Sequence, residues 1–326
     1  DTPARVADYV DMAITQATTG RCGPVVLMLP ADLLLEPAEA TAIRQAEMGH
    51  FPLDRSQPAD AEIEAAAALL AQAERPLVIA GGGVHLSGAC AALGALQETA
   101  ALPVATTVMG KGAVSESHPL TLGVVGYFMG RNSATRYMRK LVEQADVVLL
   151  VGNRTNQNGT DSWTLLPKDA RLLHIDVDGT EIGRNYEAIR LCGDAKLTLE
   201  AITKALSAGD LSRRKTGRSS LEAEIAEARK AHLREAQEVI ASSASPMRPE
   251  RVMTEIDARL GSDAIVVADA SYSSIWVTNF IRAKRAGMRF ITPRGLAGIG
   301  WGLPLAIGAK TAAPEAPVVC VAGYGG

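Results

Sequence analysis

The sequence has no apolar run long enough to cross a membrane and no block of charge of one sign. No stretch reaches the roughly 18 to 20 consecutive apolar residues that a membrane helix requires. The first residues also lack the charged and then apolar order of a signal peptide. The 33 basic and 36 acidic residues are scattered and nearly cancel, which gives a net charge of −3. We therefore expect neither a nucleic-acid partner nor a membrane partner.

Cysteine is scarce, and its spacing excludes two kinds of site. The residues Cys22, Cys90, Cys192 and Cys320 form no C-x-x-C motif and no Cys/His pair at metal-ligand spacing. A disulfide framework and a zinc centre are thus not expected. Reduced thiols are typical of the cytoplasm, which is the predicted location. The densest basic run, Arg213-Arg214-Lys215, lies in a polar stretch and is predicted to be a short exposed loop.

Motifs of hydrolytic catalysis are missing as well. No serine stands in G-x-S-x-G, and no metal-hydrolase motif occurs. Five histidines lie in a linker, a surface helix, turns or strand ends, where a structural hydrogen-bonding role is expected: His50, His85, His118, His174 and His232. No catalytic residue is assigned from the sequence.

What the sequence does contain is a regular alternation of apolar strands and amphipathic helices. With 326 residues and 47% apolar content, the chain can bury the cores of about two domains. Strands separated by helices favour an α/β fold with doubly wound, mostly parallel sheets. Helices are predicted at 59–73, 87–100, 133–144 and 194–205, and strands at 76–80, 103–106, 145–151 and 171–177.

Both ends of the chain carry further elements. A helix is predicted over 3–18, followed by a strand over 24–30 that is apolar on both faces. These two cannot form a domain alone, because the edges of a lone strand need partners. Beyond a charged connecting helix at 220–242, a last unit is predicted with helices at 249–260 and 304–312, strands at 264–269 and 317–322, a polar turn at 270–274 and a glycine-rich loop at 295–302.

Polar segments follow three predicted strands of the central unit. They are Gly81-Gly82-Gly83, Gly152-Asn153-Arg154 and residues 176–181. Doubly wound sheets bind ligands at the carboxyl ends of their strands. Backbone N–H groups of the glycines and the guanidinium of Arg154 suit a phosphate, and Asp176 or Asp178 suits a ribose or an adenine. A tight turn without ligand and simple helix capping remain the alternatives for these segments.

The last unit holds a second pattern of this kind. Asp269, Ser271, Tyr272 and Ser273 supply a carboxylate, hydroxyls and N–H groups at a strand end. The loop at 295–302 lets a backbone approach a ligand closely, because glycine has no side chain. Together these segments predict a diphosphate-bearing cofactor.

Six stretches of the sequence follow one another in the order of a known family pattern. They are A-T-T-G-R-C-G-P-V at 17–25, R-P-L-V-I-A-G-G-G-V at 75–84, T-V-M-G-K-G at 107–112, H-P-L-T-L-G at 118–123, H-I-D-V-D at 174–178 and G-I-G-W-G-L-P at 298–304. Taken together they resemble the thiamine-diphosphate-dependent enzymes of the acetolactate synthase type, along nearly the whole chain. The resemblance implies the end of a pyrimidine-binding domain at 1–36, a linker at 37–60, a Rossmann-like middle domain at 61–206, a connecting helix at 207–246 and the start of a diphosphate-binding domain at 247–326.

The resemblance also implies a chemistry. A 2-oxo acid such as pyruvate is decarboxylated on thiamine diphosphate, held with Mg²⁺ between subunits of a homodimer or homotetramer, and its two-carbon unit passes to a second 2-oxo acid. The middle domain is one that can bind FAD in this family. The implied flavin contacts are Gly82, Gly83, Arg154, Asp176 and Asp194, and the thiamine diphosphate contacts are Asp269, Ser271, Tyr272, Ser273, Gly298, Ile299, Gly323 and Gly325.

The chain departs from the family pattern in three places. Gly126 to Arg131 differs from the family's Gly-Met-His-Gly loop, which weakens the expectation of a flavin. Tyr324 stands where the family has the aspartate that holds the metal, and a neutral phenol is a poor ligand for Mg²⁺. The family's catalytic glutamate belongs to an earlier part of the pyrimidine-binding domain. The chain as given is therefore expected to be incomplete and inactive alone, with no metal ligand assigned.

Two alternatives stay open beside the carboligase. One is another thiamine-diphosphate enzyme, such as a 2-oxo acid decarboxylase or an aldehyde lyase. The other is a non-catalytic nucleotide-binding module that uses the turn at 81–83 and binds FAD, NAD or ADP.

Overall fold

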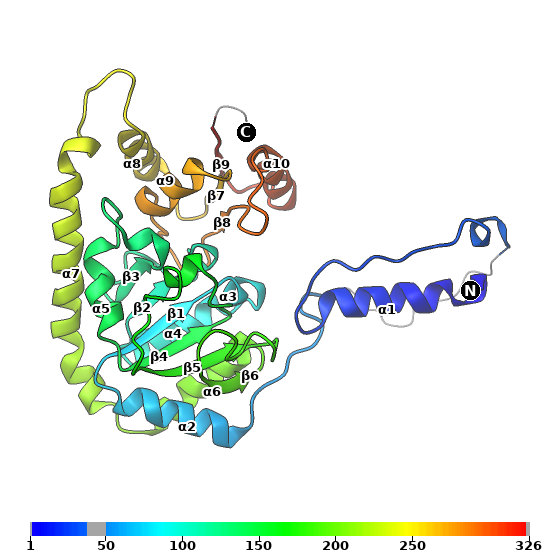
Figure 1. Ribbon diagram of the computed structural model, residues 1–326, viewed down its shortest axis with the longest axis horizontal. Coiled ribbons are helices and arrows are strands. Elements are labelled where there is room, and N and C mark those ends of the chain that lie inside the picture. The colour runs from blue at the N-terminus through cyan, green and yellow to red at the C-terminus, as the bar shows by residue number, and fades with distance from the viewer. Residues whose placement is uncertain (1, 38–49, 324–326) are drawn as a thin grey trace.

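The centre of the molecule is a six-stranded, fully parallel sheet (Figure 1). The computed structural model describes residues 2–37 and 50–323. The strand order is β3-β2-β1-β4-β5-β6, so the direction of winding reverses between β1 and β4. The strands are β1 (Pro76–Ala80), β2 (Val104–Thr106), β3 (Thr121–Val124), β4 (Val147–Val151), β5 (Arg171–Asp176) and β6 (Ile189–Cys192).

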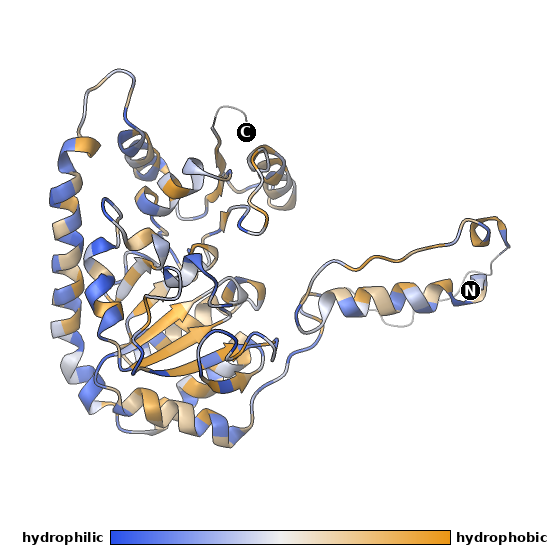
Figure 2. Ribbon diagram, in the orientation of Figure 1, coloured by the Kyte–Doolittle hydropathy of each residue, from blue (hydrophilic) through white to orange (hydrophobic). Residues whose placement is uncertain are grey.

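Helices cover both faces of this sheet. One face packs on a cluster that includes Ile63, Leu93 and Leu199, and the other packs on Val142 and Ile225. β1 and β4 are buried along their whole length, which is why they are apolar on both sides (Figure 2). The first face carries α2 (Asp60–Gln72), α3 (Gly83–Leu86), α4 (Cys90–Thr99) and α6 (Ala195–Ala208), and the second carries α5 (Arg139–Glu143) and α7 (Ser212–Ile240).

A smaller unit follows α7 and has its own parallel sheet, in the order β8-β7-β9. Its helix α9 (Tyr272–Phe280) begins in the segment predicted as a polar turn. Sequence patterning missed this helix because its serine, threonine, valine, isoleucine and aromatic residues are weak helix formers. The other elements are β7 (Ile265–Ala268), β8 (Phe290–Ile291), β9 (Val318–Val321), α8 (Pro249–Arg259) and α10 (Gly302–Ala312).

The two units are joined through Glu116, which belongs to a buried ion pair of the central unit. Lys111 Nζ lies 2.7 Å from Glu116 Oε1, and Glu116 Oε2 accepts the backbone N–H of Ala283 at 2.8 Å. Gly112 has a φ of +86°, and a Cβ there would lie 2.0 Å from the carbonyl oxygen of Met288. Only glycine fits this crossing. The junction is therefore tightly packed rather than a loose linker.

The N-terminal segment extends away from both units (Figure 1). It consists of α1 (Val6–Thr18) and a run of extended backbone. The strand predicted over 24–30 is wrong, because this run pairs with no strand among the described residues. Val26 and Met28 are more than four-fifths exposed. The physical reason is that extended backbone becomes a strand only when another strand satisfies its hydrogen bonds.

Two further findings concern the helices. The run predicted as an exposed loop at Arg213 to Lys215 lies inside α7, and Arg214 is 9% exposed and donates to the carbonyl of Glu74. That prediction is wrong because polar composition does not distinguish a loop from a surface helix. In the part of the chain that the structure describes, no helix is both long and apolar enough to cross a membrane. Short 3-10 helices lie at Pro3–Arg5, Leu33–Leu35, Val108–Gly110, Tyr127–Met129, Arg136–Met138 and Asn158–Thr160.

Candidate functional site

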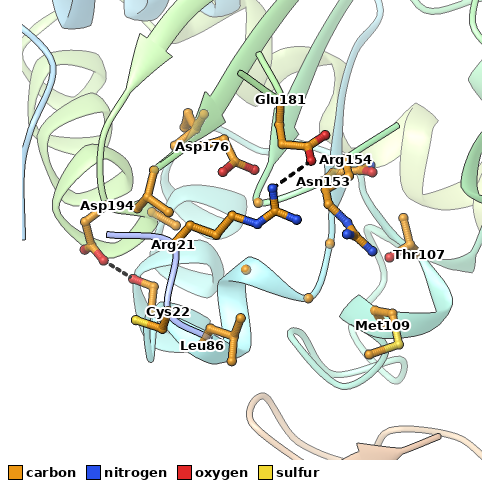
Figure 3. Close-up of a pocket in the computed structure, with 18 of the residues that line it drawn as sticks. Arg21, Cys22, Leu86, Thr107, Met109, Asn153, Arg154, Asp176, Glu181 and Asp194 are labelled. Atoms are coloured by element: carbon orange, nitrogen blue, oxygen red, sulfur yellow. Dashed lines mark hydrogen bonds and ion pairs between the residues drawn. The ribbon is translucent and has the colours of Figure 1, made fainter. Parts of the chain in front are cut away.

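A cavity of about 400 Å³ opens at the carboxyl edge of the central sheet, where the winding reverses (Figure 3). Its walls are the segments that follow all six strands in turn. Phe128 follows β3, Met109 follows β2, and the glycines follow β1. Arg154 follows β4, and residues 175–177 and 193–195 lie at the ends of β5 and β6. This is the place where doubly wound sheets bind nucleotides.

Packing explains why glycine stands at positions 81 and 83, which the sequence did not decide. A Cβ on Gly81 would lie 2.2 Å from the carbonyl oxygen of Gly152, and one on Gly83 would lie 2.6 Å from the Cα of Gly152. The turns after β1 and β4 thus cross in direct backbone contact. A Cβ on Gly82 would meet the Cβ of Met109 at 3.2 Å, a tight but adjustable contact. Two of the three glycines are required by the fold, and all three line the cavity.

The acidic candidates lie at the β5 and β6 side of the cavity. Burial raises the pKa of Asp176, whose Oδ1 accepts the backbone N–H of Asp178 at 2.9 Å. Asp194 caps α6 by accepting from the N–H of Leu197, and it also accepts from Arg55 at 2.8 Å and Ser87 at 2.7 Å. Its contacts are those of a structural cap.

Sequence reasoning missed Arg21 as a residue of this cavity. Its guanidinium extends from the N-terminal segment to Glu181 Oε1 at 3.1 Å and Asp178 Oδ2 at 2.8 Å (Figure 3). The hydrogen bond to Asp178 raises the pKa of Arg21. Its place within the A-T-T-G-R-C-G-P-V stretch was the available signal. The segment outside the central unit thus closes one wall of the cavity.

Arg154 lies across the cavity from Asp194, on the side where Glu181 also lies (Figure 3). Its side chain points toward Thr107 and Met109 in Figure 3, away from Asp194. Its carbonyl accepts from Asn185 at 3.4 Å, whereas its guanidinium has no carboxylate partner among the described residues. An exposed, unpaired guanidinium at a cavity wall suits an anionic group of a ligand.

The candidates of the smaller unit gather at the ends of β7 and β9. Asp269 is 1% exposed and accepts the backbone N–H groups of Ala270, Gly300 and Gly302 at 2.8, 3.0 and 3.3 Å. These bonds lower its pKa against the opposing effect of burial. Because its oxygens accept N–H groups of the glycine-rich loop, Asp269 shapes that loop.

The remaining candidates surround this loop. Ser271 has a φ of +63°, and Tyr272 and Ile299 are 70% and 65% exposed. A Cβ on Gly323 would lie 3.9 Å from the hydroxyl of Ser273, so the ends of β7 and β9 are in contact. Gly298 lies beside the indole of Trp301. Tyr324 and Gly325 lie outside the described residues.

This edge fits a diphosphate better than it fits a metal ion. Exposed hydroxyls, N–H groups and a glycine loop are present, but over residues 2–37 and 50–323 no group of three acidic, histidine or cysteine side chains is placed to hold a metal. Two of the histidines make the expected structural hydrogen bonds. His85 Nε2 bonds the carbonyl of Lys111 at 2.9 Å, and His118 bonds Glu98 at 3.0 Å. His174 is buried in β5, where its Nε2 has no hydrogen-bond partner among the described residues.

The fold and this edge define a class of protein: a doubly wound nucleotide-type domain followed by a second parallel-sheet unit with a glycine-rich cofactor loop. Comparison with known families agrees. The model of the thiamine pyrophosphate enzyme central domain matches residues 63–202, and that of the C-terminal TPP binding domain matches residues 269–326. The chain belongs to the thiamine pyrophosphate enzymes, which confirms the predicted family and the α/β fold class.

Curated relatives extend this similarity to nearly the whole chain. A probable acetolactate synthase large subunit of Methanocaldococcus jannaschii is 34% identical over 99% of this chain and 54% of the relative. The acetolactate synthase large subunit of Parasynechococcus marenigrum is 31% identical over 98% and 50%. A probable 2-ketoarginine decarboxylase of Pseudomonas aeruginosa is 31% identical over 99% and 54%. The chain spans about half the length of these relatives.

Proposed function

We propose that the protein containing this chain is a thiamine-diphosphate-dependent carboligase of the acetolactate synthase type. The observation that carries this proposal is the similarity to acetolactate synthase large subunits over 98 to 99% of the chain. In the proposed reaction, one pyruvate loses CO₂ and its two-carbon unit forms a carbon–carbon bond with the keto carbon of a second pyruvate. When bound, thiamine diphosphate supplies the electron sink for the decarboxylation.

The described residues suit particular parts of this task. The exposed Ser271, Tyr272 and the loop around Ile299 would hold the diphosphate edge and one face of the cofactor, while Asp269 keeps the loop in place. Mg²⁺ is proposed with the cofactor, but no described side chain is assigned to it. The donors that the described residues offer at this edge include backbone N–H groups and hydroxyls, and none of them is assigned as an acid or a base.

The cavity in the middle domain is proposed to bind a nucleotide, with FAD as the first candidate. Gly82, Gly83 and Arg154 would face its phosphates and Asp176 its ribose, whereas Asp194 would act through its cap on α6. We also propose a cytoplasmic protein with reduced thiols and a homodimer or homotetramer. All four cysteines are free, and several apolar side chains near Ile299 are exposed.

Product analysis tests the proposed reaction. The full-length protein, supplied with pyruvate, thiamine diphosphate and Mg²⁺, should form acetolactate, detected as acetoin after acid decarboxylation. Omission of thiamine diphosphate should abolish the product. Release of CO₂ with an aldehyde and no acetolactate would instead favour a 2-oxo acid decarboxylase, the second candidate, which the similarity to a probable 2-ketoarginine decarboxylase supports. Nucleotide binding with no thiamine-dependent turnover of any 2-oxo acid would overturn both.

A further inference from the structure

Arg294 is the one described residue of the smaller unit that lines the cavity of the middle domain. It follows β8 and reaches the cavity across the junction between the two units. Neither the sequence patterns nor the family match assigned it a role. Its position makes it the direct link between the nucleotide cavity and the unit that carries the glycine-rich cofactor loop.

The guanidinium of Arg294 is half-buried and is not neutralised. Nη2 donates to the hydroxyl of Ser274 at 2.6 Å, and Nε is buried without an acceptor. No carboxylate among the described residues pairs with it, and burial lowers its pKa. Arg21, on the same cavity, pairs with two carboxylates. Keeping a desolvated cation unpaired is unfavourable, so an acceptor supplied by a ligand would relieve it.

The side chain is also held in a fixed orientation. Its guanidinium carbon lies 5.3 Å from the centre of the Phe128 ring, and Ser274 fixes one end of the fork. Packing on an aromatic ring fixes the plane of a guanidinium. The N–H groups lie in that plane and can donate to two oxygen atoms at once. Arg294 is thus prepared for directional hydrogen bonding.

The place of Arg294 in the cavity indicates which part of a ligand it meets. Phe128 follows β3, whereas Asp176 ends β5, and the strand order puts β2, β1 and β4 between them. Four inter-strand steps correspond to about 19 Å. If the ribose of a ligand lies at Asp176 and its phosphates lie where the winding reverses between β1 and β4, Arg294 meets the other end of the ligand. That end belongs to a distal group of an elongated ligand.

We propose that Arg294 is a specificity-determining residue that binds acceptor oxygens on the distal half of a dinucleotide-like ligand. This inference depends on the proposed nucleotide cavity, but it does not depend on acetolactate formation. It predicts that the cavity distinguishes ligands by length. A short nucleotide that ends at the reversal point does not reach Arg294, and a dinucleotide does.

Calorimetric titration of the full-length protein with FAD and with ADP tests the proposal. Arg294→Met should weaken FAD binding by about tenfold or more, because a hydrogen bond from a charged donor contributes at least that factor. ADP binding should stay unchanged, which also shows that the variant is folded. Arg294→Lys should recover part of the FAD affinity, since it keeps the charge without the planar fork.

A matched control is Arg285→Met in the same unit, because Arg285 is exposed and bonds Asp263 at 3.1 Å outside the cavity. It should leave both affinities unchanged. Equal FAD affinity in the wild type and Arg294→Met would overturn the proposal, as would an equal loss for FAD and ADP. A wild-type protein that binds neither would overturn the nucleotide cavity together with this inference. Loss of acetolactate formation alone would concern the reaction only.

Discussion

At the scale of single residues, Gly83 lies where two turns cross with no room for a side chain. A Cβ there would lie 2.6 Å from the Cα of Gly152. Gly83→Ala should therefore lower the free energy of unfolding by roughly 1 to 3 kcal/mol, measured by urea denaturation. Gly94→Ala is the control, because Gly94 lies inside α4 with nothing within 4 Å of the added Cβ. It should raise stability by roughly 0.5 to 1 kcal/mol. A Gly83→Ala protein as stable as wild type would contradict the crossing.

Asp178 connects the N-terminal segment to the cavity in a pH-dependent way. Hydrogen bonds from Thr180 and Arg21 lower its pKa from 3.8 to about 2. The pKa of Asp178 is lower in the folded than in the unfolded protein. The ionised carboxylate therefore stabilises the fold fully above pH 3.8, and this stabilisation is lost as the pH falls toward 2. In Arg21→Met the pKa of Asp178 should rise, but only in part, since Thr180 remains. Carboxyl titration by NMR measures this.

The control for that titration is Arg5→Met. Arg5 pairs with Asp8 at 4.0 Å in α1, far along the N-terminal segment from Asp178. It should leave the pKa of Asp178 at about 2. A titration curve of Asp178 that is identical in Arg21→Met and wild type would show that Arg21 does not bind there in solution.

At the scale of elements, the contact of Glu116 with the backbone N–H of Ala283 in the smaller unit is held in place by an ion pair between Lys111 and Glu116, both of the middle domain. Their side chains are only 3% and 11% exposed. Lys111→Met removes one partner and leaves a buried carboxylate, which should lower the free energy of unfolding by about 3 to 5 kcal/mol. Lys140→Met, at an exposed position, should change it by less than about 0.5 kcal/mol. Equal losses in the two variants on urea denaturation would show that the pair is not formed.

Asp269 organises the loop that begins α10. Its oxygens accept the N–H groups of Gly300 and Gly302. Asp269→Asn keeps one acceptor and loses the charge, so the two glycine amides should exchange hydrogen faster, and stability should fall by roughly 1 to 3 kcal/mol. Hydrogen exchange read by mass spectrometry measures the loop directly. Asp263→Asn, at a side chain that is 78% exposed, should leave this exchange unchanged.

The elements themselves were predictable where burial imposes a simple pattern. β1 and the ends of α8 and α10 lie within two residues of their predicted positions because apolar runs and proline or glycine mark them. β3, β6 and β8 were missed, since strands of two to four residues are too short to give a periodic signal. They are strands only because a neighbouring strand accepts their hydrogen bonds.

At the scale of the whole molecule, apolar side chains of the smaller unit lie exposed on one helix and the loop before it. Leu303 and Ile307, four residues apart on α10, are 59% and 60% exposed, and Leu296 is 99% exposed. We expect such a surface to be an association site. Ile307→Glu should shift the full-length protein toward the monomer in light scattering coupled to size exclusion. Glu315→Gln, an exposed position past the helix, is the control. An oligomer unchanged by Ile307→Glu would exclude this face as its interface.

The candidate site shows the same division between local and distant information. Gly82, Gly83, Arg154 and Asp176 were predicted from their positions after strands, and the structure places all four on one cavity. Arg21 and Arg294 were not predicted, because neither directly follows a predicted strand of the central unit. They reach the cavity only through the packing of three separate segments. Whether these residues bind a ligand stays a prediction for the titrations above.

The sequence by itself determined the family, the α/β class and the strand ends on which ligands would be bound, because apolar periodicity and glycine turns are local properties of the chain. Only the tertiary structure determined which charged side chains have an ion-pair partner and which do not. Arg21 and Asp194 are neutralised by partners more than a hundred residues away, whereas Arg154 and Arg294 are not neutralised by any described residue. Whether two charged groups pair depends on the distance between them in space. That distance is set by the packing of segments that lie far apart in the sequence.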